Sequence, residues 1–334
     1  MEILLNPGIT WVVLIQGFGE WLLAPMKLFS FLGSEEFFLF FLPVVYWCLD
    51  TSLGLRVGFI LLFSGGLNDI LKLSFQGPRP YWFSLAVKAM TSETSFGVPS
   101  GHAQIAVGIW GMVASHIRRS WAWITAILVI LLIGISRMYL GVHFPHDVIL
   151  GWLIGSLTLW LFIRFWDPIA SWLKKIPPRK LILLAFGLSI VIILIGGLVF
   201  AGLRDWVIPE VWLENASRAG SELPAPVTLS GIITSAGTLF GLMVGVVWMT
   251  GRGGFNASGP VWQRIVRYII GLVGVMILYQ GLKFIFPTGE NVLAYVFRYL
   301  RYTMVGAWIS AGAPWVFIKS KIALPTNSKK ISLT

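Results

Sequence analysis

The sequence predicts an all-α, polytopic integral membrane protein with about nine transmembrane helices. Hydrophobic residues make up 57% of the 334-residue chain, the mean hydropathy is +0.82, and charged residues make up only 12%. Soluble domains carry about twice that charged fraction, so a chain of this composition cannot cover its apolar surface in water. The 17 tryptophans and 23 phenylalanines agree, because aromatic side chains concentrate at bilayer interfaces.

The elements follow from apolar runs that are long enough to cross the hydrocarbon core as helices. The segment 8–32 is apolar but is interrupted by Glu20, Pro25 and Lys27. We expect an interfacial or partly inserted helix there, and a tenth span is the alternative. The predicted spans lie near 34–49, 52–71, 101–117, 120–140, 147–166, 181–203, 227–250, 263–286 and 300–318.

A proline-rich basic stretch at residues 168–180 is the best candidate for a domain boundary. Nearly all unusual polar residues fall in residues 1–167, which also include the N-terminal interfacial segment. Residues 168–334 are expected to be C-terminal transmembrane helices of unknown role. Cys48 is the single cysteine, which excludes an intramolecular disulfide and a cysteine-based metal site.

The net charge of +11 comes from basic residues in short loops, so binding to nucleic acid is not expected. One set of loops carries Arg118, Arg119, Lys174, Lys175, Arg179, Lys180, Arg252, Arg264, Arg267, Lys319, Lys321, Lys329 and Lys330. The long loop on the other side carries Asp205, Glu210, Glu214 and Glu222. Because positive residues mark the cytoplasmic face, the loops after the spans 52–71 and 120–140 are expected to face outward and the C-terminus inward. A bacterial plasma membrane is the expected location, with a eukaryotic organelle as the alternative.

Three cations lie at helix ends on the outward side. Lys72 and Arg79 follow the second span, and Arg137 lies at the end of the fourth. Each alone is most simply an interface anchor. Together they can converge on a multiply charged anion, and the planar arginine fork matches phosphate oxygens.

Two histidines and a predicted helix start accompany these cations. Ser100-Gly101 precedes an apolar run, so free backbone N–H groups there favour an anion. His102 and His143 can supply a nucleophile and an acid or base near neutral pH. A new helix is expected near Pro145, and Asp147 in its first turn can accept the ring N–H of His143.

These residues resemble the three-part signature of the PAP2 (type-2 phosphatidic acid phosphatase) superfamily, and the chain is lipid phosphate phosphatase-like over roughly residues 34–166. The blocks are Lys72-x6-Arg79-Pro80, Pro99-Ser100-Gly101-His102 and Ser136-Arg137-x5-His143-x3-Asp147. The resemblance implies a PAP2-type helical catalytic core within residues 1–167 that requires no metal and no other cofactor.

The resemblance also implies a role for each matching residue. His143 attacks phosphorus and forms a phosphohistidine, with Asp147 orienting its ring. His102 protonates the leaving oxygen and later activates water. The transition-state oxygens are held by Lys72, Arg79, Ser100, the Gly101 amide and Arg137.

The substrate class stays open at this point. A site at the bilayer face suits a membrane lipid substrate, so an isoprenoid, sphingoid or phosphatidate phosphate or diphosphate is expected. A short stretch, Leu32–Phe38, resembles sphingosine-phosphate phosphatases, whereas Arg79-Pro80-Tyr81-Trp82 resembles glucose-6-phosphatase. Hydrolysis of a soluble phosphosugar is therefore one alternative. Phosphotransfer to an alcohol acceptor is another, since its first half-reaction is the same. A non-enzymatic lipid carrier or scaffold is a further alternative.

Overall fold

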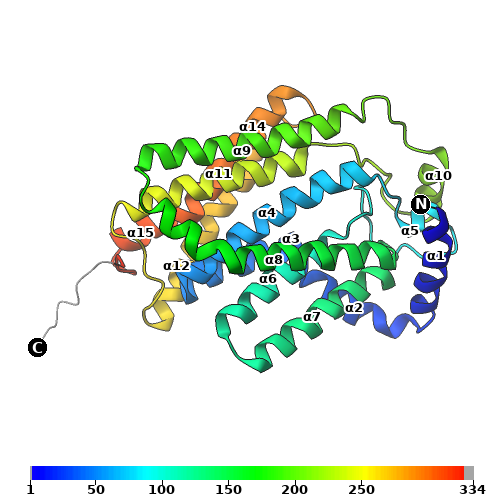
Figure 1. Cartoon of the computed structure of the whole chain (residues 1–334), viewed down its shortest axis with the longest axis horizontal. Helices are drawn as coiled ribbons and strands as arrows, with labels where there is room; N and C mark the ends of the chain where they lie inside the picture. The colour runs from blue at the N-terminus through cyan, green and yellow to red at the C-terminus, as the bar shows by residue number, and fades with distance from the viewer. Residues whose placement is uncertain (1, 327–334) are drawn as a thin grey trace, which may run out of the picture. The chain divides into compact units, whose positions relative to one another are not determined.

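The computed structural model describes residues 2–326, with side chains from Leu5 onward, so Lys329 and Lys330 lie outside the described residues. Within this range the structure is helical, and its β pairing is limited to one antiparallel bridge between Asn256 and Leu324. The helices, shown in Figure 1, are α1 (Glu2–Gln16), α2 (Leu23–Phe31), α3 (Glu35–Val44), α4 (Thr51–Phe75), α5 (Pro80–Phe83), α6 (Gly101–Ile117), α7 (Ser120–Tyr139), α8 (Pro145–Leu173), α9 (Pro178–Ala201), α10 (Glu210–Arg218), α11 (Ser230–Thr250), α12 (Val261–Met276), α13 (Leu282–Ile285), α14 (Val292–Ala307) and α15 (Ala313–Lys319).

The all-α membrane architecture is confirmed, but the number of nine spans is not. Among the described residues, six helical segments are long and apolar enough to cross a bilayer: Thr51–Phe83, Ser120–Tyr139, Pro145–Leu173, Pro178–Ala201, Ser230–Thr250 and Val261–Ile285. The other three predicted spans coincide with helices that do not meet this criterion. One of them, α6, has only 17 residues, which is shorter than the ~20 that a perpendicular span needs.

The N-terminal segment forms two helices in place of one. Helices α1 and α2 are bent by 87° with respect to each other, and together they pass the same length and hydropathy test as one broken or re-entrant span. The bend contains Gly19 at φ 107°, a backbone conformation that glycine adopts without a steric penalty. The side chain of Gln16 at the end of α1 donates to the carbonyls of Lys88 and Tyr139, so it ties α1 to α7.

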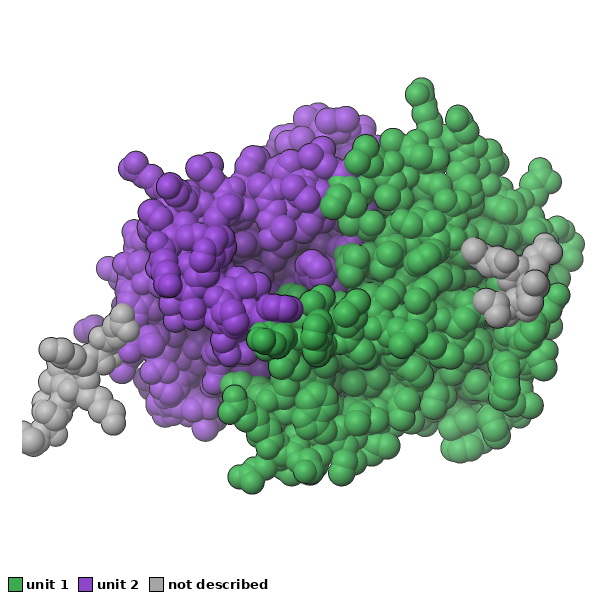
Figure 2. Space-filling model, viewed as in Figure 1, with its two compact units in different colours: residues 1–38, 67–164, 195–228 green, residues 39–66, 165–194, 229–334 purple. Residues whose placement is uncertain are grey.

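The described chain divides into two compact units, coloured separately in Figure 2. Unit 1 comprises residues 1–38, 67–164 and 195–228, and unit 2 comprises residues 39–66, 165–194 and 229–334. The boundary predicted at residues 167–168 lies inside α8, which continues through Pro168, and the two-part division stays a prediction. Another proline of the predicted boundary stretch, Pro178, is the first residue of α9, a position that proline favours in helices.

Unit 1 contains the region where the sequence signature falls. Helix α7 contacts α6, α2 and α1, and the short helix α5 contacts α1 and α10. Figure 1 shows α1, α5 and α10 next to one another. Two segments outside the signature, at the N-terminus and at residues 195–228, are therefore part of the same compact unit.

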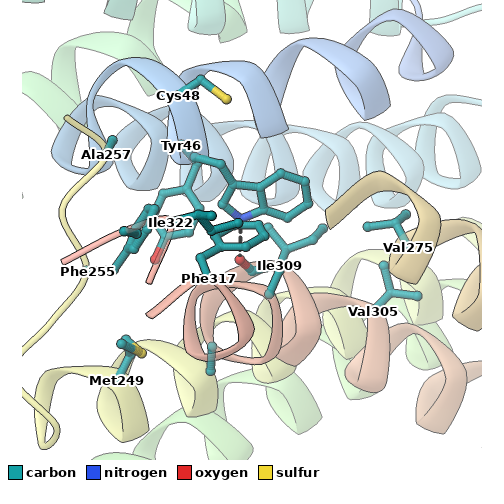
Figure 3. Packing of buried hydrophobic residues seen from close by; sticks show 14 residues of the cluster. Tyr46, Cys48, Met249, Phe255, Ala257, Val275, Val305, Ile309, Phe317 and Ile322 are labelled. Atoms are coloured by element: carbon teal, nitrogen blue, oxygen red, sulfur yellow. Dashed lines mark hydrogen bonds between the residues drawn. The ribbon is translucent and has the colours of Figure 1, made fainter. Parts of the chain in front are cut away.

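Unit 2 has a core built around the end of the first predicted span. Trp47 is fully buried, donates its indole N–H to the Ile309 carbonyl at 2.9 Å and meets the Phe317 ring edge-on. Figure 3 shows Ile309 and Phe317 within this cluster of buried hydrophobic residues. Gly271 of α12 allows this arrangement, since a Cβ there would lie 2.3 Å from the Trp47 ring.

Arg267, one of the residues that we assigned to a basic loop, is instead fully buried within α12. Its guanidinium donates to the carbonyls of Trp47, Ala257 and Ser258 at 3.0, 2.9 and 3.0 Å. This side chain therefore satisfies buried backbone groups in unit 2 and does not contribute a loop charge to the membrane orientation.

Replacing Arg267 by methionine is expected to lower the free energy of unfolding by at least ~3 kcal/mol, because buried carbonyl groups lose their donors. Unfolding in mixed detergent micelles, followed by circular dichroism, measures this loss. The exposed Arg252, which lies over the Trp248 ring at 3.8 Å, provides the matched control Arg252→Met. Equal effects of the two substitutions would contradict a structural role for Arg267.

Candidate active site

Lys72 and Arg79 are positioned by the last turn of α4 and by the loop that follows it. Arg79 is fully buried, and it donates through Nε to the Ser95 carbonyl at 2.7 Å and through Nη1 to the Val142 carbonyl at 3.0 Å. The Nζ of Lys72 donates to the Ser95 hydroxyl at 3.0 Å, and so does Nη2 of Arg79. Ser95 thus connects the first two predicted cations.

The start of α6 lies where the sequence predicts it. Ser100 is the N-cap residue and accepts a hydrogen bond from the Ala103 amide, and Gly101 is the first helical residue. Behind this start, Nδ2 of Asn68 donates to the Pro99 carbonyl at 3.3 Å and to Gln104 Oε1 at 2.9 Å. This buried pair of side-chain amides therefore fixes the segment that leads into α6 and its free backbone N–H groups.

Two glycines of α8 allow its backbone to lie directly against this helix start. A Cβ on Gly151 would lie 2.6 Å from the Ser100 carbonyl oxygen, and one on Gly155 would lie 2.6 Å from that of Gln104. The two glycines are four residues apart, on one face of α8, which is the spacing that brings membrane helices into close contact. The amide of Ser100 also donates to the Asp147 carbonyl at 3.0 Å.

His143 and Asp147 form the pair that the sequence predicts, around a helix that begins at Pro145. Nδ1 of His143 lies 3.3 Å from Oδ2 of Asp147, which also accepts the Phe144 amide at 2.8 Å. Asp147 is fully buried and His143 is 1% exposed, so the ring is held in one orientation. When Nδ1 carries the proton, the lone pair of Nε2 points toward Arg79, whose Nη1 lies 3.4 Å away.

The surroundings of His143 favour its neutral form. Burial lowers the pKa of His143 well below its usual value, and the nearby charges of Arg79 and Arg137 lower it further. A neutral imidazole with an unprotonated Nε2 can act as a nucleophile toward an electrophilic centre.

Arg137 closes the cation cluster from the last turn of α7. It is 3% exposed, and its Nη1 donates to the hydroxyl of Ser30 in α2 at 2.6 Å. Its Nη2 forms a short ion pair with Oε1 of Glu93, and the other oxygen of Glu93 lies 3.5 Å from Arg79 Nη2. The carboxylate therefore bridges the two arginines.

The structure brings all the predicted site residues together in unit 1. Lys72, Gly101 and His102 are half-buried, whereas Arg79, Ser100, Arg137, His143 and Asp147 are buried. His102 lies in the first turn of α6, within electrostatic reach of Arg137 and Glu93. Three cations, two imidazoles and free helix amides at one place can bind a phosphate group and transfer it.

We predicted no role in the site for the loop residues Glu93 and Ser95 or for the supporting residues Ser30, Asn68 and Gln104. Asn68 carried a usable signal, because it is a polar residue on a membrane helix one turn before Lys72. Glu93 gave no such signal, since a carboxylate is not expected to lie in a site for anions.

A segment beyond residue 168 also supports the site. The hydroxyl of Ser92 is hydrogen-bonded to that of Ser221 at 2.8 Å, and the amide of Ala225 donates to the Thr94 carbonyl at 3.0 Å. The Phe96 ring meets Trp206 with centroids 5.1 Å apart. Residues 203–226, which we call the strap, thus hold the loop that carries Glu93.

Comparison with known proteins identifies related sequences over most of the chain. Residues 53–171 match the family described as the PAP2 superfamily, and residues 233–325 match the transmembrane extension of PAP2 superfamily phosphatases. Glucose-6-phosphatase 3 of Bos taurus is 25% identical over 95% of this chain and 96% of its own, and the Homo sapiens protein is 25% identical over 94% and 95%. An undecaprenyl-diphosphatase of Sulfolobus acidocaldarius is 41% identical, over 29% of this chain and 48% of its own.

Among solved structures, a transmembrane PAP2-type phosphatidylglycerolphosphate phosphatase from Bacillus subtilis matches with 26% identity and a TM-score of 0.42. The match covers 48% of this chain and 86% of that one.

Substituting Gly151 by alanine is expected to lower the affinity for inorganic phosphate about tenfold or more, because the new methyl group displaces Ser100 and the free amides at the start of α6. Isothermal titration of the detergent-purified protein measures this affinity. The control is Gly187→Ala in α9, where a Cβ would meet nothing within 4 Å. An unchanged affinity in Gly151→Ala would show that the helix start does not contact the anion.

Proposed function

Because the chain is a membrane phosphatase of the PAP2 superfamily, with its PAP2 domain in residues 53–171, we propose that it hydrolyses a phosphate ester through a phosphohistidine formed on His143. The observation that carries this proposal is the geometry of the His143 ring. Asp147 lies on its Nδ1 side, and the arginine cluster lies on its Nε2 side. A phosphate bound by the arginines therefore lies next to the nucleophilic nitrogen.

In the first step, Nε2 of His143 attacks phosphorus while the bond from phosphorus to the leaving oxygen breaks. His102 gives its proton to that oxygen, and the alcohol product leaves. In the second step, water attacks the phosphohistidine, and His102 takes up the proton that water loses. Inorganic phosphate departs and His143 is regenerated.

The remaining site residues stabilise charge during both steps. Lys72, Arg79 and Arg137 can bind the non-bridging oxygens, together with the Ser100 hydroxyl and the Gly101 amide. Asp147 keeps the proton on Nδ1 and stabilises the positive charge that develops on the ring. All of these groups belong to the protein, and the proposed mechanism has no step that uses a metal ion.

For the substrate, we place a phosphosugar monoester first and a lipid phosphate or diphosphate second. Similarity to proteins named glucose-6-phosphatase extends over 95% of this chain and includes the C-terminal transmembrane region. Similarity to the undecaprenyl-diphosphatase covers only 29% of it. The sequence alone favoured the lipid, and it remains the second candidate because the site belongs to a membrane-embedded domain.

The orientation is part of the same proposal. His102 and Arg137 lie at the ends of α6 and α7 that are opposite to the basic turn formed by Arg118 and Arg119. Since positive loops face the cytoplasm, the site opens to the periplasm or to an organelle lumen.

Substituting His143 by alanine is expected to lower the rate of phosphate release by at least ~1000-fold, because the chain loses its nucleophile. In the variant His102→Ala, the rate of phosphate release is expected to fall about 100- to 10,000-fold, because the general acid is missing. The control is His116→Ala, at the far end of α6. The assay measures phosphate release in EDTA from glucose phosphate, polyprenyl diphosphate, phosphatidate and sphingosine phosphate.

Radioactive phosphate from the preferred substrate is expected to appear on wild-type protein as an acid-labile phosphohistidine, and to be absent from His143→Ala. Release that survives in His143→Ala would overturn the mechanism. Label on His143 without release to water, but with transfer to an added alcohol, would assign the chain as a phosphotransferase.

Between pH 7 and pH 6, kcat/KM is expected not to fall through protonation of His143. Its lowered pKa means that the free ring is still neutral below the usual histidine value of ~6.5, so the nucleophile is available there. Two substrates whose phosphate groups ionise at different pH separate the enzyme's titration from their own. An acid limb near pH 6.5 that is the same for both substrates would contradict the neutral state of His143.

A further inference from the structure

Glu93 places a carboxylate between the arginines of the phosphate site. One oxygen is paired with Nη2 of Arg137, and the other lies 3.5 Å from Nη2 of Arg79. The side chain is 27% exposed, whereas those of Arg79 and Arg137 are 0% and 3% exposed. Its two oxygens are thus directed at the donors that a phosphate group would use, and Glu93 is more exposed than either arginine.

The backbone of Glu93 is fixed from two directions. The hydroxyl of the buried Tyr81 donates to the Glu93 carbonyl at 2.8 Å and accepts its amide at 3.1 Å. On either side in the sequence, Ser92 and Thr94 are hydrogen-bonded to the strap. The side chain can therefore leave the arginines by rotating about its own bonds, without displacement of the loop.

The carboxylate carries a full negative charge in the empty site. Burial acts to raise the pKa of Glu93, but the charges of Arg79 and Arg137 outweigh it and hold this pKa well below its usual range. His102 and Lys72 act in the same direction as the arginines. A phosphate group that enters the site meets this charge at close range, and two anions cannot share the same donors.

We propose that Glu93 is an internal competitor of phosphate, which occupies the arginines in the empty site and must rotate away when substrate binds. The inference rests on the phosphate-binding role proposed above for Arg79 and Arg137. It assigns Glu93 as a binding-site residue that sets the affinity for phosphate groups.

This competition has a consequence for product release. A site with three cations binds inorganic phosphate as well as a phosphate ester, so the product is a strong inhibitor unless something replaces it. Departure of phosphate would leave buried guanidinium groups without an anionic partner, which is costly. The return of Glu93 removes that cost, and the carboxylate therefore accelerates the last step of the cycle.

The variant Glu93→Gln tests the proposal, because it keeps the shape and removes the charge. Inorganic phosphate and orthovanadate are used as competitive inhibitors of hydrolysis, and their inhibition constants are expected to fall about tenfold, equivalent to about 1.4 kcal/mol. The turnover number is expected to fall because release of inorganic phosphate slows. The alcohol product is then expected to appear as a burst in the first cycle. The matched control is Glu222→Gln, an exposed carboxylate of the strap, whose constants are expected to match the wild type.

An unchanged or raised inhibition constant for phosphate in Glu93→Gln would overturn the proposal. A raised KM for a hydroxylated substrate with unchanged phosphate inhibition would also overturn it, and would show that Glu93 contacts the leaving group. If Glu93→Gln does not fold, Glu93→Asp retains the charge but withdraws it from the arginines, and a lower inhibition constant is again expected.

Wild-type protein provides a measurement that does not depend on any variant. A structure of the wild type with bound orthovanadate, determined by cryo-electron microscopy, is expected to show the Glu93 carboxylate rotated away from Arg79 and Arg137, with the backbone of residues 91–96 unmoved. A Glu93 carboxylate still paired with both arginines would contradict displacement. If the wild type neither binds phosphate nor releases it from any substrate, the proposed function fails. If it does both and Glu93→Gln binds phosphate no more tightly, only the role of Glu93 fails.

Discussion

Unit 1 brings three cations together in a largely buried site, and the groups around them are placed so that they compensate for this charge. Lys72, Arg79 and Arg137 come from three different segments, and two of them are almost inaccessible to water. Like charges brought together in a region of low dielectric repel each other and lose hydration. The surrounding groups offset this cost: the Ser95 hydroxyl and carbonyl, the Val142 carbonyl, the Ser30 hydroxyl and above all the Glu93 carboxylate.

The same cluster determines the state of the proposed nucleophile. Positive charge beside His143 disfavours a second proton on its ring, and the buried Asp147 fixes which nitrogen holds the first one. In the proposed mechanism, the charge that would bind a phosphate group therefore also keeps the attacking nitrogen unprotonated. Substrate binding and activation of the nucleophile would then be two effects of one electrostatic arrangement.

The compact unit that holds the site is not a continuous stretch of sequence. It combines the bent N-terminal pair, the signature region and residues 195–228. Ser30 of α2 contacts Arg137, and the strap fixes the loop that carries Glu93. Segments that carry no signature of their own therefore help to position the site residues Arg137 and Glu93, and similarity to relatives also extends well beyond the signature.

Features that depend on local spacing along the chain could be predicted without the structure. Apolar runs predicted the helices, Ser100-Gly101 predicted the start of α6, and Pro145 predicted the helix that presents Asp147 to His143 four residues earlier. Pairs between distant residues could not be predicted in this way; examples are Arg137 with Glu93, Asn68 with Gln104 and Arg267 with the Trp47 carbonyl. The physical reason is that helix formation and capping depend on neighbours along the chain. The cost of a buried charge is instead offset by whichever group the fold places beside it, even when that group, like Glu93, has a charge that the site would be expected to exclude.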